Sequence, residues 1–321
     1  MSDNNAIENN TEKTEQNKNT QTENTKISQM SSQNKKLRGI LHIILAAFSF
    51  SLMTLFLKLA GDLPTMQKVF FRNAVALILA VSILMKSEEK FKIKRQSYVG
   101  ILCRCLFGTA GVIANFWAID RLGLADSNML NKMSPFFAMI MSIFILKEKP
   151  NAFEWGTVIL AFIGVVFIVK PGMGLASLPA LVGLFSGFGA GTAYSFLRSV
   201  TSKGERGTIV VMCFSLFSTL VSLPFIIFDF HPMTAKQWIF MILAGCGAMG
   251  GQMNITAAYT YAPAKEISVY DYIQVVFAAI WGIFIFSEIP DILSIIGYVI
   301  IIGAGVIRWR YTLWKESNNS N

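Results

Sequence analysis

The sequence predicts an all-α integral membrane protein with ten transmembrane helices, arranged as two inverted five-helix repeats. Three observations support this fold class. Of the 321 residues, 53% are hydrophobic and 15% are charged, whereas a soluble domain carries about 25% charged residues. The charges cluster between apolar runs of about 20 residues, the length that crosses the hydrocarbon core of a bilayer. The second half of the chain also repeats features of the first.

The N-terminal segment, residues 1–37, is rich in Asn, Thr, Gln, Glu and Lys and contains no aromatic residue. Such a segment buries too little apolar surface to offset the entropy of ordering it. We therefore expect a disordered cytoplasmic tail, with a solvated linker favoured over a docking segment. The tail lacks the apolar core and cleavage site of a signal peptide, so the first span is expected to remain in the mature protein.

Ten apolar segments follow the tail. Their approximate limits are 39–60, 66–85, 98–118, 124–146, 153–170, 178–198, 208–228, 236–257, 264–286 and 291–310. Residues 38–171 and 177–311 are expected to form the two five-helix repeats. Residues 312–321 are expected to form a short cytoplasmic tail.

The basic residues predict the orientation of these spans. With the N-terminus inside, seventeen Lys and Arg residues flank the inner ends of the spans and five flank the outer ends. By the positive-inside rule, both termini are expected in the cytoplasm. The net charge of +9 is thus explained by topology, and no nucleic-acid partner is expected. The four cysteines all lie within spans and are interpreted as packing residues.

The sequence matches itself at an offset of 140 residues. The matches pair Phe56-Leu57-Lys58 with Phe196-Leu197-Arg198, Gly111 with Gly251, Ala118 with Ala258, Glu148 with Glu288 and Pro150 with Pro290. Each half holds five spans, and because five is odd the second half enters the membrane from the opposite side. Inverted repeats of this kind are typical of secondary transporters. The repeat therefore favours a carrier over a membrane-embedded enzyme acting on a lipid-linked substrate, or a channel.

These residues resemble those of a known family. A Glu-x-Pro turn follows the fourth and ninth spans, at Glu148-Lys149-Pro150 and Glu288-Ile289-Pro290, and Ser134-Pro135 lies in the fourth. This pattern resembles the EamA-type branch of the drug/metabolite transporter superfamily over residues 39–310. The resemblance implies a carrier of a small organic metabolite with a central cavity shared by both halves. Span nine has Gln274-Val275 in place of Ser134-Pro135, which leaves open whether it bends as span four does.

Polar residues deep in the spans are the candidate solute-binding residues, because polar groups in spans are rare and usually face the bundle interior. They are Arg72, Arg104, Asn115, Asn128, Asn131 and Lys132 in the first half, and Tyr194, Gln252, Asn254, Asp271, Tyr272 and Gln274 in the second. The offset pairs Asn131 with Asp271 and Lys132 with Tyr272. The two polar clusters are therefore expected to meet near the membrane midplane.

Each candidate has a second interpretation that the sequence leaves open. Arg72 and Arg104 lie near enough to span ends for their side chains to snorkel to the interface. Lys132 and Asp271 form a structural ion pair, contact solute, or, for Asp271, carry a coupling proton. The buried amides hydrogen-bond between helices or bind solute. The tyrosines are more often packing residues than ligand contacts.

The deep charges predict the solute. Arg72, Arg104 and Lys132 are three cations against one anion, Asp271, which favours an amino acid or related solute that is anionic or zwitterionic. No phosphate-binding loop occurs, and the two histidines are isolated. We therefore expect no enzymatic activity, metal site or cofactor. The expected partners are a small-molecule solute and the lipid of a cytoplasmic cell membrane, and a homodimer is compatible with the sequence.

Overall fold

The computed structural model describes residues 34–35, 37–88, 91–147, 149–170, 177–261 and 268–319. Residues 1–33 of the predicted tail lie outside these ranges, while residues 34, 35 and 37 are helical. Glu148 of the first Glu-x-Pro turn also lies outside them, as do Lys36, Lys90 and Lys265, which contribute to the predicted orientation.

Every regular element in these ranges is a helix. The first helix spans Leu37–Leu59. The others are α2 (Thr65–Met85), η1 (Arg95–Ser97), α3 (Tyr98–Ile119), α4 (Leu124–Asn131), α5 (Ser134–Ile145), α6 (Ala152–Val169), α7 (Ser177–Thr201), α8 (Gly207–Phe228), α9 (Ala235–Tyr261), η3 (Ser268–Tyr272), α11 (Ile273–Phe286) and α12 (Ile292–Asn319). Nine helices in the described ranges are long and apolar enough to cross a membrane. The remaining predicted span, 124–146, is divided between α4 and α5.

The break between α4 and α5 has a local cause in the sequence. Pro135 lies in the first turn of α5; proline has no amide hydrogen, and its ring clashes with the carbonyl four residues earlier, here that of Asn131. The α-helix therefore ends at Asn131, and Lys132 becomes its C-cap residue. The predicted bend is thus a complete interruption of the helix at Lys132 and Met133.

Span nine changes its helix type at the corresponding place, without a proline. It begins as the 3-10 helix η3, which ends at Tyr272, and continues as α11 from Ile273. Tyr272 is the repeat counterpart of Lys132. The counterpart of the proline bend is therefore a change from 3-10 helix to α-helix at Tyr272, whereas span four breaks between two α-helices at Lys132 and Met133.

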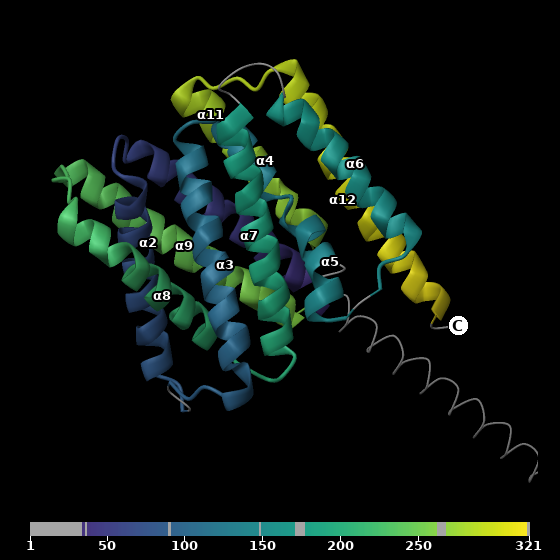
Figure 1. The fold of residues 1–321 in the computed structure, drawn as a ribbon, viewed down its shortest axis with the longest axis horizontal. Helices are drawn as coiled ribbons and strands as arrows, with labels where there is room; N and C mark the ends of the chain where they lie inside the picture. The colour runs from purple at the N-terminus through teal and green to yellow at the C-terminus, as the bar shows by residue number, and fades with distance from the viewer. Residues whose placement is uncertain are drawn as a thin grey trace, which may run out of the picture.

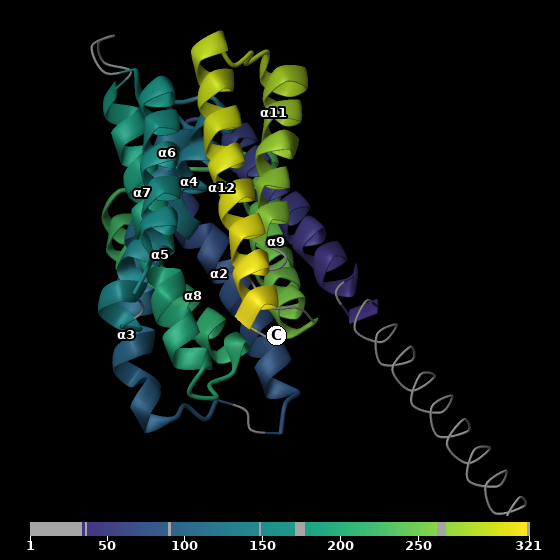
Figure 2. The same ribbon diagram turned by 90° about the vertical axis from the view of Figure 1, so that its right-hand side faces the viewer.

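The two halves interleave, because each main helix pair joins one helix from either half. α3 packs along α7, α2 along α8, and α6 along α12; Figure 1 shows α6 and α12 side by side at one edge of the bundle. Figure 2 shows the end of α2 and the start of α3 at one end of the bundle, and the connection between α11 and α12 at the other. This arrangement agrees with the inverted five-helix repeats predicted from the sequence.

Small residues set the distance between α3 and α7. A Cβ atom added at Gly189 of α7 would lie 2.8 Å from the Cα of Gly111 and 2.9 Å from the carbonyl oxygen of Phe107, both on α3. The repeat forms the same kind of crossing between α9 and the first helix, where a Cβ at Gly247 would lie 3.0 Å from the carbonyl oxygen of Ser49. Close backbone approach is how helices gain packing energy where lipid removes the hydrophobic drive.

Ion pairs close the end of the bundle that holds the α11–α12 connection. Glu288 pairs with Lys58 and accepts a hydrogen bond from the backbone N–H of Leu124 at 3.0 Å. Lys170 pairs with Asp291 of the other half, and its hydrogen bond holds the pKa of the Asp291 carboxyl below the ordinary value. At the end of α3, burial instead raises the pKa of the Asp120 carboxyl against the opposing effect of Lys68, which lies 2.6 Å away. This end of the bundle is held by charge as well as by packing.

Gly189→Ala is expected to lower the unfolding temperature of the protein in detergent. The added methyl group meets backbone atoms that cannot rotate away, so α3 and α7 must separate, at a cost of about 1–3 kcal/mol. Gly303→Ala is the matched control, because a Cβ added there would meet no atom within 4 Å beyond its chain neighbours and the backbone of its own helix. Equal unfolding temperatures for the two variants would contradict the close crossing.

Candidate functional site

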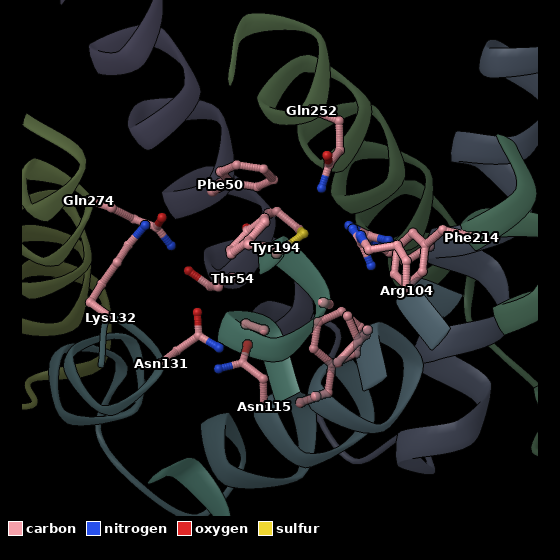
Figure 3. A pocket seen from close by; sticks show the side chains of 18 residues that line it. Phe50, Thr54, Arg104, Asn115, Asn131, Lys132, Tyr194, Phe214, Gln252 and Gln274 are labelled. Atoms are coloured by element: carbon pink, nitrogen blue, oxygen red, sulfur yellow. The ribbon is translucent and has the colours of Figure 1, made fainter. Parts of the chain in front are cut away.

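A cavity lies inside the bundle between helices of both halves. Its volume is about 90 Å³ on a measure by which one water molecule needs about 10–15 Å³. Eight of the twelve predicted binding residues line it: Arg72, Arg104, Asn115, Asn131, Lys132, Tyr194, Gln252 and Gln274. In Figure 3, Lys132 and Gln274 lie on one side of the cavity, and Arg104 lies with Phe214 on the other. The polar clusters of the two halves meet, as the sequence predicts.

An ion pair joins the two helix breaks. The Nζ atom of Lys132 lies 2.5 Å from Oδ2 of Asp271, and the two side chains are 8% and 18% exposed. Lys132 is held by its place at the end of α4, where its backbone N–H donates to the carbonyl of Asn128 at 2.9 Å. Lys132 lines the cavity, whereas Asp271 lies outside the lining. The ion pair, which is one of the interpretations that the sequence left open, is therefore formed, and Lys132 also lines the cavity.

The second oxygen of Asp271 and one amide nitrogen in the cavity have no partner in the described part of the chain. Oδ1 of Asp271 is buried without a hydrogen bond, and so is Nδ2 of Asn115. A buried polar atom without a partner is costly and usually has a functional or structural explanation. Oδ1 of Asp271 is left to accept a hydrogen bond, and Nδ2 of Asn115, which lines the cavity, is left to donate one to water or a solute.

Gln274 reaches the cavity because Asn128 holds it. The side-chain Nε2 of Gln274 donates to Oδ1 of Asn128 at 2.7 Å, and Nδ2 of Asn128 donates to the carbonyl of Leu124 at 2.8 Å. Asn128 is 2% exposed and does not line the cavity. Its contacts are those of a residue that positions Gln274.

The two arginines do not snorkel toward the membrane interface. Arg72 of α2 and Arg104 of α3 are 3% and 5% exposed and both line the cavity. The guanidinium carbon of Arg104 lies 4.5 Å from the ring centre of Phe214 and 6.0 Å from that of Tyr194. Aromatic faces attract cations, so these rings hold the arginine on the cavity wall.

Two of the predicted residues lie elsewhere. Oδ1 of Asn254 accepts a hydrogen bond of 2.8 Å from Nδ1 of His42, which connects α9 to the first helix. Tyr272 packs where a Cβ at Gly305 of α12 would lie 2.7 Å from its ring. Neither lines the cavity. Their positions fit the packing and interhelical interpretations that the sequence left open.

The apolar part of the lining and one hydroxyl are not predicted by the sequence. The missed residues are Phe50, Met53, Thr54, Gly108, Gly111, Val112, Phe116, Ala190, Ala193 and Phe214. Apolar residues fill every span, so their type carries no signal. Thr54 is polar, but a hydroxyl within a span is often occupied by the backbone, as here by a 2.9 Å bond to the carbonyl of Ser51.

Lys132→Ala and Asp271→Ala are each expected to lower the free energy of unfolding. Each loss is expected to exceed half of the loss in the double variant. Each single change leaves one buried charge without its partner, which costs about 3–5 kcal/mol. Thermal unfolding of the three variants gives the coupling between the two sites. The same cycle on Lys170 and Asp291, which are 17% and 56% exposed, is the control and is expected to give about 0–1 kcal/mol. Purely additive losses at Lys132 and Asp271 would contradict the buried pair.

Comparison with known proteins identifies the family. The model of the EamA-like transporter family matches twice, at residues 37–170 and 177–308. The chain is 34% identical over 276 residues to a pseudopaline exporter of Pseudomonas aeruginosa, covering 85% of this chain and 96% of that protein. It is 24% identical to a riboflavin transporter of Vibrio cholerae, covering 90% of this chain and 99% of that protein.

Two more distant likenesses agree with these matches. Solute carrier family 35 member G1 of Mus musculus is 25% identical, with 84% of this chain and 79% of that protein covered. A crystal structure with 14% sequence identity has the same fold, with a TM-score of 0.60 over 84% of this chain and 95% of that one. The relatives are named as transporters or exporters. The chain therefore belongs to the EamA-like transporter family and is a multi-pass membrane transporter of small molecules, not an enzyme.

Proposed function

We propose that the protein is a secondary transporter that moves a small anionic or zwitterionic organic solute, such as an amino acid or related metabolite, by alternating access. One observation carries the proposal. The cavity is lined by three basic side chains, Arg72, Arg104 and Lys132, while Asp271 is the one carboxylate paired with any of them among the described residues. A cation removed from water gains most from an opposite charge, so the cavity favours a solute with a carboxylate or phosphate.

The proposed solute site consists of the eight lining residues that the sequence predicted. Arginine and lysine would contact the acidic group of the solute, and Asn115, Asn131 and Gln252 would hydrogen-bond its polar groups. Asn128 would act through Gln274, which it holds in place. Polar contacts of this kind fix orientation and give specificity in a largely apolar pocket.

Alternating access follows from the inverted halves. Because both halves line the cavity, movement of one against the other would open it first to one side of the membrane and then to the other. Inverted repeats supply two related conformations for this purpose. The likeness to a protein named as an exporter supports outward movement of the solute.

Asp271 is the candidate proton carrier in this proposal. A solute carboxylate that binds Lys132 from the cavity would compete with Asp271 for the ammonium group, since the two atoms now lie 2.5 Å apart. The released carboxylate, with neither oxygen then partnered, is the proposed carrier of a coupling proton.

Lys132→Ala and Asp271→Asn are expected to abolish saturable counterflow of an acidic or zwitterionic solute in proteoliposomes. The assay offers a pooled set of labelled small metabolites to the wild type and both variants. Arg121→Gln is the control, because Arg121 is exposed and lies over Trp117 outside the cavity. Counterflow retained by both variants would make the pair structural. Turnover of a substrate without a sealed compartment would favour the enzyme alternative, and flux that does not saturate would favour a channel.

The proposal sets both termini on the cytoplasmic side of a bacterial cytoplasmic membrane, which accessibility labelling tests. In a variant without the four native cysteines, Ser202→Cys on the α7–α8 turn is expected to react with an impermeant maleimide only after the cells are opened. Asp229→Cys on the α8–α9 turn is expected to react in intact cells. Both positions are exposed and lie on turns at opposite ends of α8. The reversed pattern would contradict the positive-inside assignment.

A further inference from the structure

Arg72 and Arg104 come from different helices and converge on one aromatic ring. The guanidinium carbons lie 5.9 Å and 4.5 Å from the ring centre of Phe214 on α8. Both side chains are more than nine-tenths buried and both line the cavity. Figure 3 shows Arg104 against Phe214, with its nitrogen atoms directed into the cavity. Two positive charges thus occupy one wall of a buried space.

Neither arginine has an acidic partner in the part of the chain that the structure describes. Asp271 is paired with Lys132, and the other ion pairs of the described ranges involve neither arginine. The Nε atoms of both arginines are buried without a hydrogen bond. Arg72 and Arg104 also repel each other electrostatically. Like charges out of water are stable only when something compensates them.

Neighbouring residues fix the two guanidinium groups in place. Gly108 leaves the space that Arg104 fills, since a Cβ at that position would lie 2.1 Å from Nη1 of Arg104. Nη1 of Arg72 donates to Oδ1 of Asn73 at 2.5 Å, and Nδ2 of Asn73 donates to the carbonyl of Val69 at 2.8 Å. The arginines are thus positioned before any ligand is present, which is what an anion site requires.

We infer that Arg72 and Arg104 form a clamp for two negative charges of one solute, and that the part of the solute bound between them carries two carboxylates. While Asp271 pairs with Lys132, the two arginines are the positive charges of the cavity that no carboxylate of the described residues neutralises. Each planar guanidinium matches one carboxylate through two parallel hydrogen bonds. This inference rests on the proposed function and narrows its solute from an anion or zwitterion to a solute with two acidic groups.

Binding of succinate and butyrate to the purified full-length protein tests the clamp. The two probes have the same chain length and differ in the second carboxylate. Titration calorimetry in detergent at neutral pH is expected to give succinate an affinity at least about tenfold higher than that of butyrate. Arg72→Gln and Arg104→Gln are each expected to remove this advantage.

A second pair of variants tests whether binding depends on the position of the Arg104 guanidinium and not only on its charge. Gly108→Ala keeps every charge but displaces the Arg104 guanidinium, so it is expected to reduce the succinate advantage as well. Gly303→Ala, whose new methyl group meets no atom within 4 Å beyond its chain neighbours and the backbone of its own helix, is expected to keep it. Equal affinities for the two probes, no binding of succinate, or an advantage that survives in Arg72→Gln and Arg104→Gln would overturn the inference. Inorganic phosphate binding more tightly than succinate would overturn the dicarboxylate assignment.

The test separates this inference from the proposed function, because binding in detergent needs no transport. Succinate selectivity without counterflow of any solute would contradict the transporter mechanism and support the clamp. Counterflow without selectivity for the second carboxylate would support the mechanism and overturn the clamp.

Discussion

A charge in hydrocarbon must be compensated, and the interior of this protein is arranged around that requirement. An Arg, Lys or Asp at the centre of a span costs about 2.5–3.5 kcal/mol on insertion scales. Lys132 and Asp271 meet the requirement by pairing, and Arg72 and Arg104 by stacking on aromatic rings beside a cavity. The rest of the bundle, including its close helix crossings, surrounds these few groups.

The interrupted helices are what bring the charges of the two halves together. If span four were one continuous helix, Lys132 would be a residue in its middle, with its backbone carbonyl committed to the next turn. Because α4 ends at Asn131, Lys132 is its C-cap residue. In the second half, Asp271 lies near the end of η3, and the next residue, Tyr272, is the N-cap of α11. Broken helices at the midplane are tolerated where they line a cavity, which is where solute sites of transporters form.

Much of the fold could be predicted from the sequence, because the thickness of the bilayer sets the length of each span and the 140-residue offset marks the two repeats. The candidate site could be predicted only in part. Lys132 and Arg104 stand out because charge is rare in spans, and both line the cavity. Asn254 and Tyr272 are equally polar by composition but face neighbouring helices, and helix rotation is set by tertiary packing that periodicity alone does not give. Phe214, the platform under both arginines, is one of 26 phenylalanines and carries no distinguishing signal.

The ion pair between Lys58 and Glu288 has a consequence for how the bundle can loosen. Lys58 lies at the end of the first helix and Glu288 on the connection after α11, so the pair joins segments that are far apart in the chain. Lys58 also donates to the carbonyl of Leu122 at 3.2 Å, and Glu288 accepts from the backbone N–H of Leu124 at the start of α4. Three segments therefore meet at one carboxylate, and loss of this single group would release all three together.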